Sequence, residues 1–182
     1  MTVEHYLGLV EAGVLTVYDR VELLEGVVVA MTPSNPPHAA AVARANQALL
    51  RVIGERAHLR PQLSLVLRRS VPEPDLAVVP GSADDYDTAH PTTALLVIEV
   101  SDSSLKQDRL SKAAIYAAAG IPEYWIVNLR DDVVERMRDP DRAAARYRDV
   151  RSVARGETLE LVALPGASVV VSELLPRRSA GA

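Results

Sequence analysis

Two carboxylates stand on apolar segments instead of in surface loops, and their position suits them to chemistry. Asp75 opens the run D-L-A-V-V directly after P-E-P, and Glu99 lies near the end of L-L-V-I-E-V. On neighbouring strands the two groups would repel one another unless a cation or a proton lay between them. Hard oxygen ligands with no His or Cys beside them favour Mg²⁺ or Mn²⁺ over zinc.

The chain's two lysines, Lys106 and Lys112, both follow Glu99, and all its other basic residues are arginine. Asp108, Lys112 and Tyr116 are spaced i, i+4, i+8, which places them on one face of a helix. An ammonium group is a compact charge that can orient a water or neutralise a developing phosphorane. Two acids, a cation and a lysine therefore predict a metal-dependent phosphodiester hydrolase.

Apolar runs and turn residues predict the elements that must position these groups. Helices are expected at residues 2–13, with Thr2 as N-cap, at 38–55, with Pro37 before it, and at 104–119, closed by Gly120. The expected strands are a hairpin at 21–31 turning at Glu25-Gly26, then 62–68, 75–79, 94–100, 123–128, 132–138 and 145–153, the last two joined by the turn D-P-D-R. Residues 80–93 read as an exposed loop.

This order of elements predicts one α/β domain with a mixed central sheet flanked by helices and a β-rich C-terminal extension. A length of 182 residues suits a single domain, expected at residues 1–176, with a disordered tail at 177–182. The absence of cysteine excludes disulfides, thiolate zinc sites and a cysteine nucleophile.

The net charge of −4 argues against broad nucleic-acid binding. Arginines do cluster at residues 51–69 and 136–155, but the second cluster is interleaved with Asp139, Asp141 and Asp149, and a solvated, salt-bridged face is the simpler interpretation. The N-terminus lacks the pattern of a signal peptide, and no apolar stretch approaches the roughly 20 residues of a membrane span. We expect a cytoplasmic protein without a membrane partner.

Three segments closely resemble the Uma-two family of restriction endonucleases, which belongs to the PD-(D/E)xK nuclease superfamily. They are P-E-P-D-L-A-V-V, V-I-E-V-S-D-S-S and D-R-L-S-K-A-A-I-Y-A-A-A-G-I-P-E-Y-W-I-V-N, and the likeness extends to residues 21–38 and to the N-terminal T-V-E-H-Y-L. The resemblance implies a restriction-endonuclease-like fold, hydrolysis of DNA with Mg²⁺ or Mn²⁺, and a homodimer.

The resemblance also implies roles for individual residues. Asp75 matches the Asp of the P-D element and Glu99 the acid of the (D/E)xK element, so both would hold the metal. Two residues after Glu99 the chain has Ser101 where the superfamily has lysine. The lysine has moved to the following helix, where Lys112 matches it.

Two further residues take roles from the same resemblance. Glu22 matches an acid that often completes the metal site, although Glu22 and Glu25 could equally decorate a hairpin. His38 is a candidate contact for the substrate phosphate, and the alternative is a residue that merely opens a helix.

Structural interpretations also exist for the main candidates. Asp75 could cap backbone amides after a turn, and Glu99 could form an ion pair with Lys112 or Arg109. Lys112 could be a surface residue paired with Asp108. The aromatic residues are expected to pack in the core and sheet: Tyr116, Tyr124 and Trp125.

Two other functions remain open from the sequence. One is a catalytically inactive nuclease fold that binds nucleic acid or a protein, which the acidic net charge and the displaced lysine favour. The other is a hydrolase acting on a different phosphorylated substrate.

Overall fold

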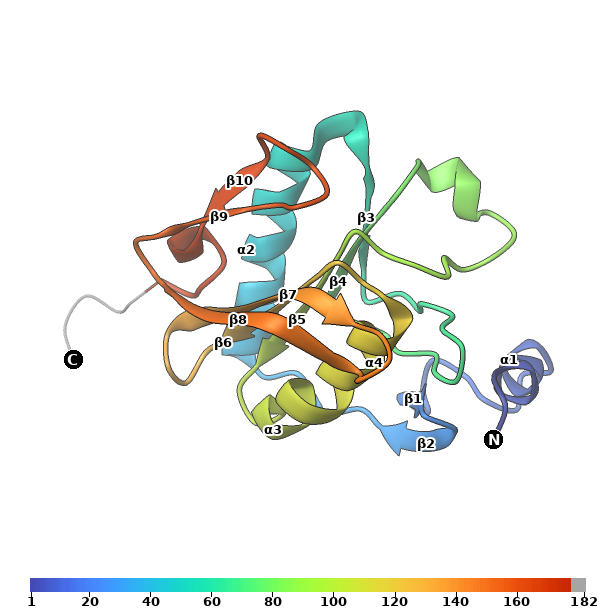
Figure 1. Cartoon of the computed structure of the whole chain (residues 1–182). Coiled ribbons are helices and arrows are strands. Elements are labelled where there is room, and N and C mark those ends of the chain that lie inside the picture. The colour runs from blue at the N-terminus through green and yellow to red at the C-terminus, as the bar shows by residue number, and fades with distance from the viewer. Residues whose placement is uncertain (178–182) are drawn as a thin grey trace.

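A computed structural model describes residues 1–177, and most of the tail expected at 177–182 lies outside the described residues. The centre of the fold is a six-stranded sheet in the order β3-β4-β5-β6-β7-β8 (Figure 1). Only β5 and β6 pair in parallel, so the sheet is mixed, as expected. The strands are β3 (His58–Pro61), β4 (Leu76–Val79), β5 (Leu96–Ser101), β6 (Glu123–Asn128), β7 (Val133–Asp141) and β8 (Arg146–Ala154).

Helices cover both faces of this sheet. Helix α2 (Pro36–Ile53) packs on the face that carries Ile98 and Val100, whereas α4 (Ala113–Ala119) packs on the face that carries Val97. Successive side chains of a strand point to opposite faces. Glu99 follows Ile98 in β5, so it shares the α4 side of the sheet with Val97.

Two small hairpins flank the sheet. The first pairs β1 (Val21–Leu24) with β2 (Val27–Ala30) and turns at Glu25-Gly26 as expected, with positive φ at both residues. Leu23 also bridges Val71, which ties the first hairpin to the segment before β4. The second hairpin pairs β9 (Thr158–Glu160) with β10 (Ser168–Val170) and adds to the α2 side of the core.

The remaining helices are short. Helix α1 (Val3–Glu11) begins at Thr2, whose side chain accepts a hydrogen bond from the His5 amide, as an N-cap does. Among the described residues, no helix is both long and apolar enough to cross a membrane. Single turns of 3₁₀-helix occur at η1 (Gly54–Arg56), η2 (Ala83–Tyr86) and η4 (Val171–Glu173).

The strand predicted at 62–68 is wrong. The strand that pairs with β4 lies earlier, at His58–Pro61, and it ends where Gln62 takes a positive φ of 49°. The following segment folds back on itself, with the Leu65 amide donating to the Pro72 carbonyl and the Leu67 amide to the Ser70 carbonyl. Leu65 and Leu67 are buried there, so their alternation reflects packing under a loop and not a sheet ladder.

The helix predicted at 104–119 is interrupted. It begins as α3 (Leu105–Gln107), widens into the π-helical segment η3 (Asp108–Lys112), and continues as α4 until Gly120, which has a left-handed φ of 80°. A π turn contains one residue more than an α turn and is common at functional sites.

The turn predicted at D-P-D-R is also misplaced, because β7 continues to Asp141 and the chain reverses at 142–145. Pro140 lies beyond the end of the β6 pairing at Arg138, so there β7 pairs with β8 alone, with Pro140 opposite Tyr147. The arginines of these strands form surface ion pairs, among them Arg136 with Asp149 and Arg148 with Asp141.

Candidate active site

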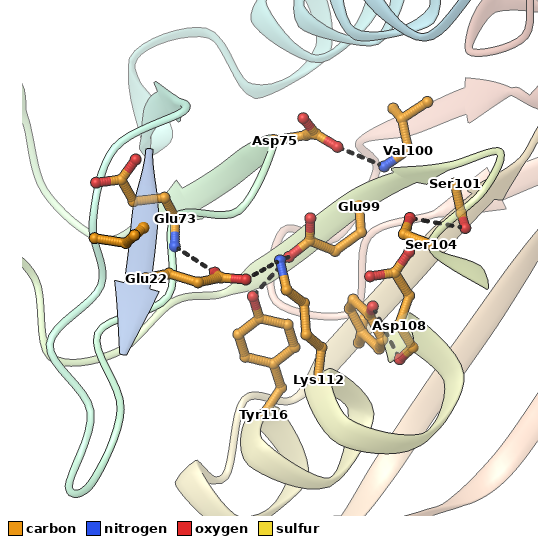
Figure 2. Close-up of polar contacts among 12 residues, drawn as sticks. Glu22, Glu73, Asp75, Glu99, Val100, Ser101, Ser104, Asp108, Lys112 and Tyr116 are labelled. Carbon is orange, nitrogen blue, oxygen red and sulfur yellow. Dashed lines mark hydrogen bonds and ion pairs between the residues drawn. The ribbon is translucent and has the colours of Figure 1, made fainter. Parts of the chain in front are cut away.

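A small polar pocket of about 70 Å³ lies where β5, the start of α2, η3 and the first hairpin meet. All five residues that the sequence singled out line it: Glu22, His38, Asp75, Glu99 and Lys112. They come from five separate stretches of the chain, and the fold gathers them in one place. Figure 2 shows Glu22, Asp75, Glu99 and Lys112 at this place. Arg20, Gln62, Glu73, Gln107 and Asp108 contribute further polar groups to the lining.

Glu99 is held by two donors from one helix. It is 4% exposed, and its Oε1 accepts hydrogen bonds from the Lys112 ammonium at 3.0 Å and the Tyr116 hydroxyl at 2.8 Å (Figure 2). Within the described residues, the other oxygen, Oε2, accepts no hydrogen bond. Arg109, the alternative partner considered for Glu99, pairs with Glu135 instead.

Lys112 bridges two acids from different parts of the fold. Besides Glu99, its ammonium contacts Oε1 of Glu22 at 3.3 Å, and Oε2 of Glu22 accepts from the Glu73 amide at 3.2 Å. At 7% exposure Lys112 is a buried residue, so its interpretation as a surface lysine is wrong. Asp108, the surface partner considered for it, accepts from the Ser104 hydroxyl at 2.6 Å.

Asp75 lies immediately before β4 and faces the end of β5. Its Oδ2 accepts from the Val100 amide at 2.8 Å and lies 3.2 Å from Nε2 of His38. It therefore does cap a backbone amide, but this bond uses only one of its two oxygens. In the part of the chain that the structure describes, Oδ1 has no hydrogen-bond partner.

His38 both opens α2 and reaches the pocket. Its amide donates to the Asn35 side chain, the N-cap of α2, while its imidazole lies between Asp75 and the Ser34 hydroxyl, which is 3.0 Å from Nδ1. The hydrogen bond with Asp75 raises the pKa of His38 above its ordinary value, although burial acts in the opposite direction.

Acids outnumber bases around the pocket. Five carboxyl groups line it, whereas the basic groups are Arg20, Lys112 and the titratable His38. Burial raises the pKa of Glu99 to about 8, which Lys112 opposes and the neighbouring carboxylates reinforce. Burial alone would lower the pKa of Lys112, but the attraction of Glu99, Glu22 and Asp108 raises it. The pocket thus favours the uptake of positive charge, as a proton or as a cation.

The residues present fit a hard divalent cation. Across the described residues, no three or more His, Cys, Asp or Glu side chains form a ready-made metal cage. Mg²⁺ does not need one, because proteins usually bind it through one or two carboxylates together with waters and substrate phosphates. Among the described residues, Asp75 and Glu99 each retain an oxygen without a hydrogen bond, in a pocket with excess negative charge.

Comparison with known proteins gives this site a context. The sequence model of a family described as "Uma2: Putative restriction endonuclease" matches residues 14–172. The chain belongs to the Uma2 family. This confirms the resemblance drawn from the sequence and supports a nuclease-like function. Among curated protein sequences, none matches this Uma2 chain.

A solved structure shares the fold. It is described as "a putative nuclease belonging to DUF820" from Anabaena variabilis ATCC 29413, and it superposes with a TM-score of 0.72 at 13% sequence identity. The alignment covers 96% of this Uma2 chain and 97% of that chain. The expected α/β nuclease fold is therefore confirmed, with its mixed central sheet flanked by helices.

Sequence reasoning missed several polar residues in or beside this Uma2 pocket, among them Tyr116, Glu73 and Arg20. Tyr116 was expected only to pack, and it is fully buried, yet its hydroxyl bonds Glu99. Its spacing of four from Lys112 was the available signal. Glu73 precedes Asp75 by two residues, the spacing that places side chains on one side of an extended chain. For Arg20, nothing in the local sequence pointed to the pocket.

Proposed function

We propose that this Uma2 protein is an endonuclease that hydrolyses DNA phosphodiester bonds with the help of Mg²⁺ or Mn²⁺. The observation that carries the proposal is the convergence of Asp75, Glu99 and Lys112 on one buried polar pocket. Two acids and a lysine of this kind suit phosphodiester hydrolysis, and the family assignment supports a nuclease.

Asp75 and Glu99 would hold the metal through the oxygens that lack hydrogen bonds, and Glu22 would assist by fixing Lys112. A divalent cation, when bound, neutralises charge on the phosphate and makes a water more acidic. The all-oxygen donor set favours Mg²⁺ or Mn²⁺ over zinc.

Two basic residues of the chain, Lys112 and His38, would contact the substrate phosphate. Lys112 has a raised pKa and remains protonated at neutral pH, so it supplies positive charge to the phosphate as negative charge develops, and it does not act as a base. His38, whose pKa is also raised, donates to a phosphate oxygen of the substrate while Asp75 fixes its ring.

Incubation of the purified protein with plasmid and oligonucleotide DNA, with Mn²⁺, Mg²⁺ or chelator, tests the proposal. We expect cleavage that requires the cation and that drops at least about 100-fold in Asp75→Asn and Glu99→Gln, the scale on which metal ligands and charge-stabilising groups contribute. Lys106→Met, which changes an exposed lysine, is the matched control for Lys112→Met. DNA binding without any cleavage would favour the inactive scaffold instead.

The homodimer implied by the resemblance is part of the same proposal. Two copies would address the two strands of a duplex, one site each. Sedimentation equilibrium of the full chain, with and without DNA, measures the mass that decides it.

A further inference from the structure

The segment between α1 and β1 is drawn in dark blue in Figure 1. It presents two large side chains to solvent, Val17 at 85% and Tyr18 at 90% exposure. Its backbone is nevertheless fixed. Oδ2 of Asp19 accepts from the Thr16 amide at 2.7 Å and the Thr16 hydroxyl at 2.9 Å, and the Asp19 amide donates back to the Thr16 carbonyl at 3.0 Å. These hydrogen bonds fix the backbone of the turn that carries Tyr18.

Arg20 connects this turn to the pocket. Its carbonyl accepts from the Met31 amide at 2.8 Å, and its side chain lines the pocket beside Glu22 and Glu73. Within the described residues its guanidinium forms no hydrogen bond or ion pair, although its charge acts on Glu73. Two residues of chain span at most about 7 Å, so the backbone of Tyr18 lies within that distance of the backbone of Arg20, which lines the pocket.

We propose that the Thr16–Arg20 turn binds the nucleic acid at the mouth of the pocket. Arg20 would form an ion pair with a backbone phosphate, and the Tyr18 ring would stack on the adjacent base. The inference rests on the proposed nuclease function and specifies its substrate. Within residues 1–177 Arg20 forms no ion pair, it lies next to the groups proposed to act on phosphate, and arginine matches phosphate geometry. An exposed aromatic ring beside such a cation is the usual platform for a stacked base.

The geometry selects one class of DNA. In a duplex the faces of the bases are covered by their neighbours, so a ring on a surface turn has none to stack on. Unpaired bases expose a face, and stacking on it is indifferent to sequence. The preferred substrate is therefore single-stranded DNA, or DNA with unpaired bases next to the cleaved bond.

Fluorescence anisotropy of the full chain with a labelled single-stranded oligonucleotide and with its duplex, in chelator to prevent cleavage, tests the inference. Tyr18→Ala should weaken single-strand binding about 5- to 150-fold, the range found for one base–aromatic stack. Tyr18→Trp should retain binding, since any aromatic face serves. The duplex should bind more weakly than the single strand, and Tyr18→Ala should change its affinity little.

Val17→Ala is the matched control, because it alters the neighbouring exposed side chain without removing a ring. Arg20→Met should weaken binding of both DNAs and reduce the salt dependence of binding by about one phosphate contact. Tyr18 is so exposed that the substitutions should leave the thermal midpoint unchanged, which a melt verifies.

Three results would overturn the inference. Equal single-strand affinity for the parent and Tyr18→Ala, in a parent that cleaves DNA, rejects the turn and leaves the proposed function standing. A change in sedimenting mass on Tyr18→Ala with unchanged DNA affinity makes the turn a protein interface instead. A parent that neither binds nor cleaves either DNA rejects the inference together with the proposed function.

Discussion

Lys112 and Tyr116, four residues apart, donate to the same atom, Oε1 of Glu99. One helix thus fixes a strand-borne carboxylate by one oxygen, and no donor from residues 1–177 reaches the other. The lysine supplies charge, while the tyrosine hydroxyl, whose pKa burial raises well above its ordinary value, stays a neutral donor.

Tyr116→Phe separates these two contributions, because it keeps the buried ring and removes only the hydroxyl. We expect a loss of about 1.5–3 kcal/mol in the free energy of unfolding, as for a hydrogen bond to a charged group. Mn²⁺ affinity should fall about 10- to 100-fold, as when a group that orients a metal ligand is removed. Urea titration and Mn²⁺ calorimetry measure the two effects. Unchanged Mn²⁺ affinity at reduced stability would limit the Tyr116 hydroxyl to a structural role.

Lys112→Met leaves Glu22 and Glu99 buried without their shared cation. Breaking a buried ion pair in this way should cost about 3–5 kcal/mol in the free energy of unfolding. Lys112 lowers the pKa of Glu99, so without it Glu99 should hold its proton to higher pH and the variant should regain part of its stability in acid. Urea unfolding across pH tests this. Lys106→Met, on the exposed side of α3, should stay within about 0.5 kcal/mol of the parent at every pH.

The raised pKa of Glu99 makes cation binding depend on pH. The group has a pKa of 4.5 when unfolded and about 8 when folded, so its contribution to stability is complete below 4.5 and is lost as the pH rises towards 8. A metal ion displaces that proton, so Mn²⁺ should bind more tightly as pH rises through the same window and should release protons. Calorimetry in two buffers of different ionisation enthalpy counts those protons. No release, or equal binding by Glu99→Gln, would remove Glu99 from the metal site.

His38 reports independently on Asp75, the second acid proposed to hold the metal. Its pKa is raised from 6.5 by the hydrogen bond with Asp75, so its contribution to stability is complete below 6.5 and is lost as pH rises through the folded value. An NMR titration of the imidazole should show the raised pKa in the parent. In Asp75→Asn the pKa should fall, because the largest influence that raises it is removed while burial still lowers it. A titration that Asp75→Asn leaves unchanged would contradict the contact.

The fold was predictable where local chemistry and packing agree. The Glu25-Gly26 turn and the continuous apolar run of β5 marked their elements, and Gly120 closes α4 as expected. The prediction of a strand at 62–68 was wrong because alternating burial requires only that one side of the segment face the core. A loop that folds back on itself meets that requirement without a partner strand.

The candidate site, like the fold, was predictable only where a residue stood out against its local sequence. An acid on a buried strand is costly without a partner, so Asp75 and Glu99 stood out from the sequence. Tyr116 did not, because a tyrosine among alanines is usual in a core. Arg20 did not either, because nothing in its local sequence marks it, although its backbone pairs with Met31 and it lines the pocket.

Because of the π turn at Asp108–Lys112, the direction in which the helix presents its pocket residues depends on the number of residues in that turn. Removing one residue, such as Ser111, would restore α-helical spacing and rotate the preceding turn by about 100° relative to Lys112 and Tyr116. Asp108 and Ser104 would then leave the pocket while the two donors to Glu99 kept their places. The number of residues in this helix therefore matters as well as their identity. A one-residue deletion outside the lining would change the shape and charge of the pocket although no lining residue is substituted.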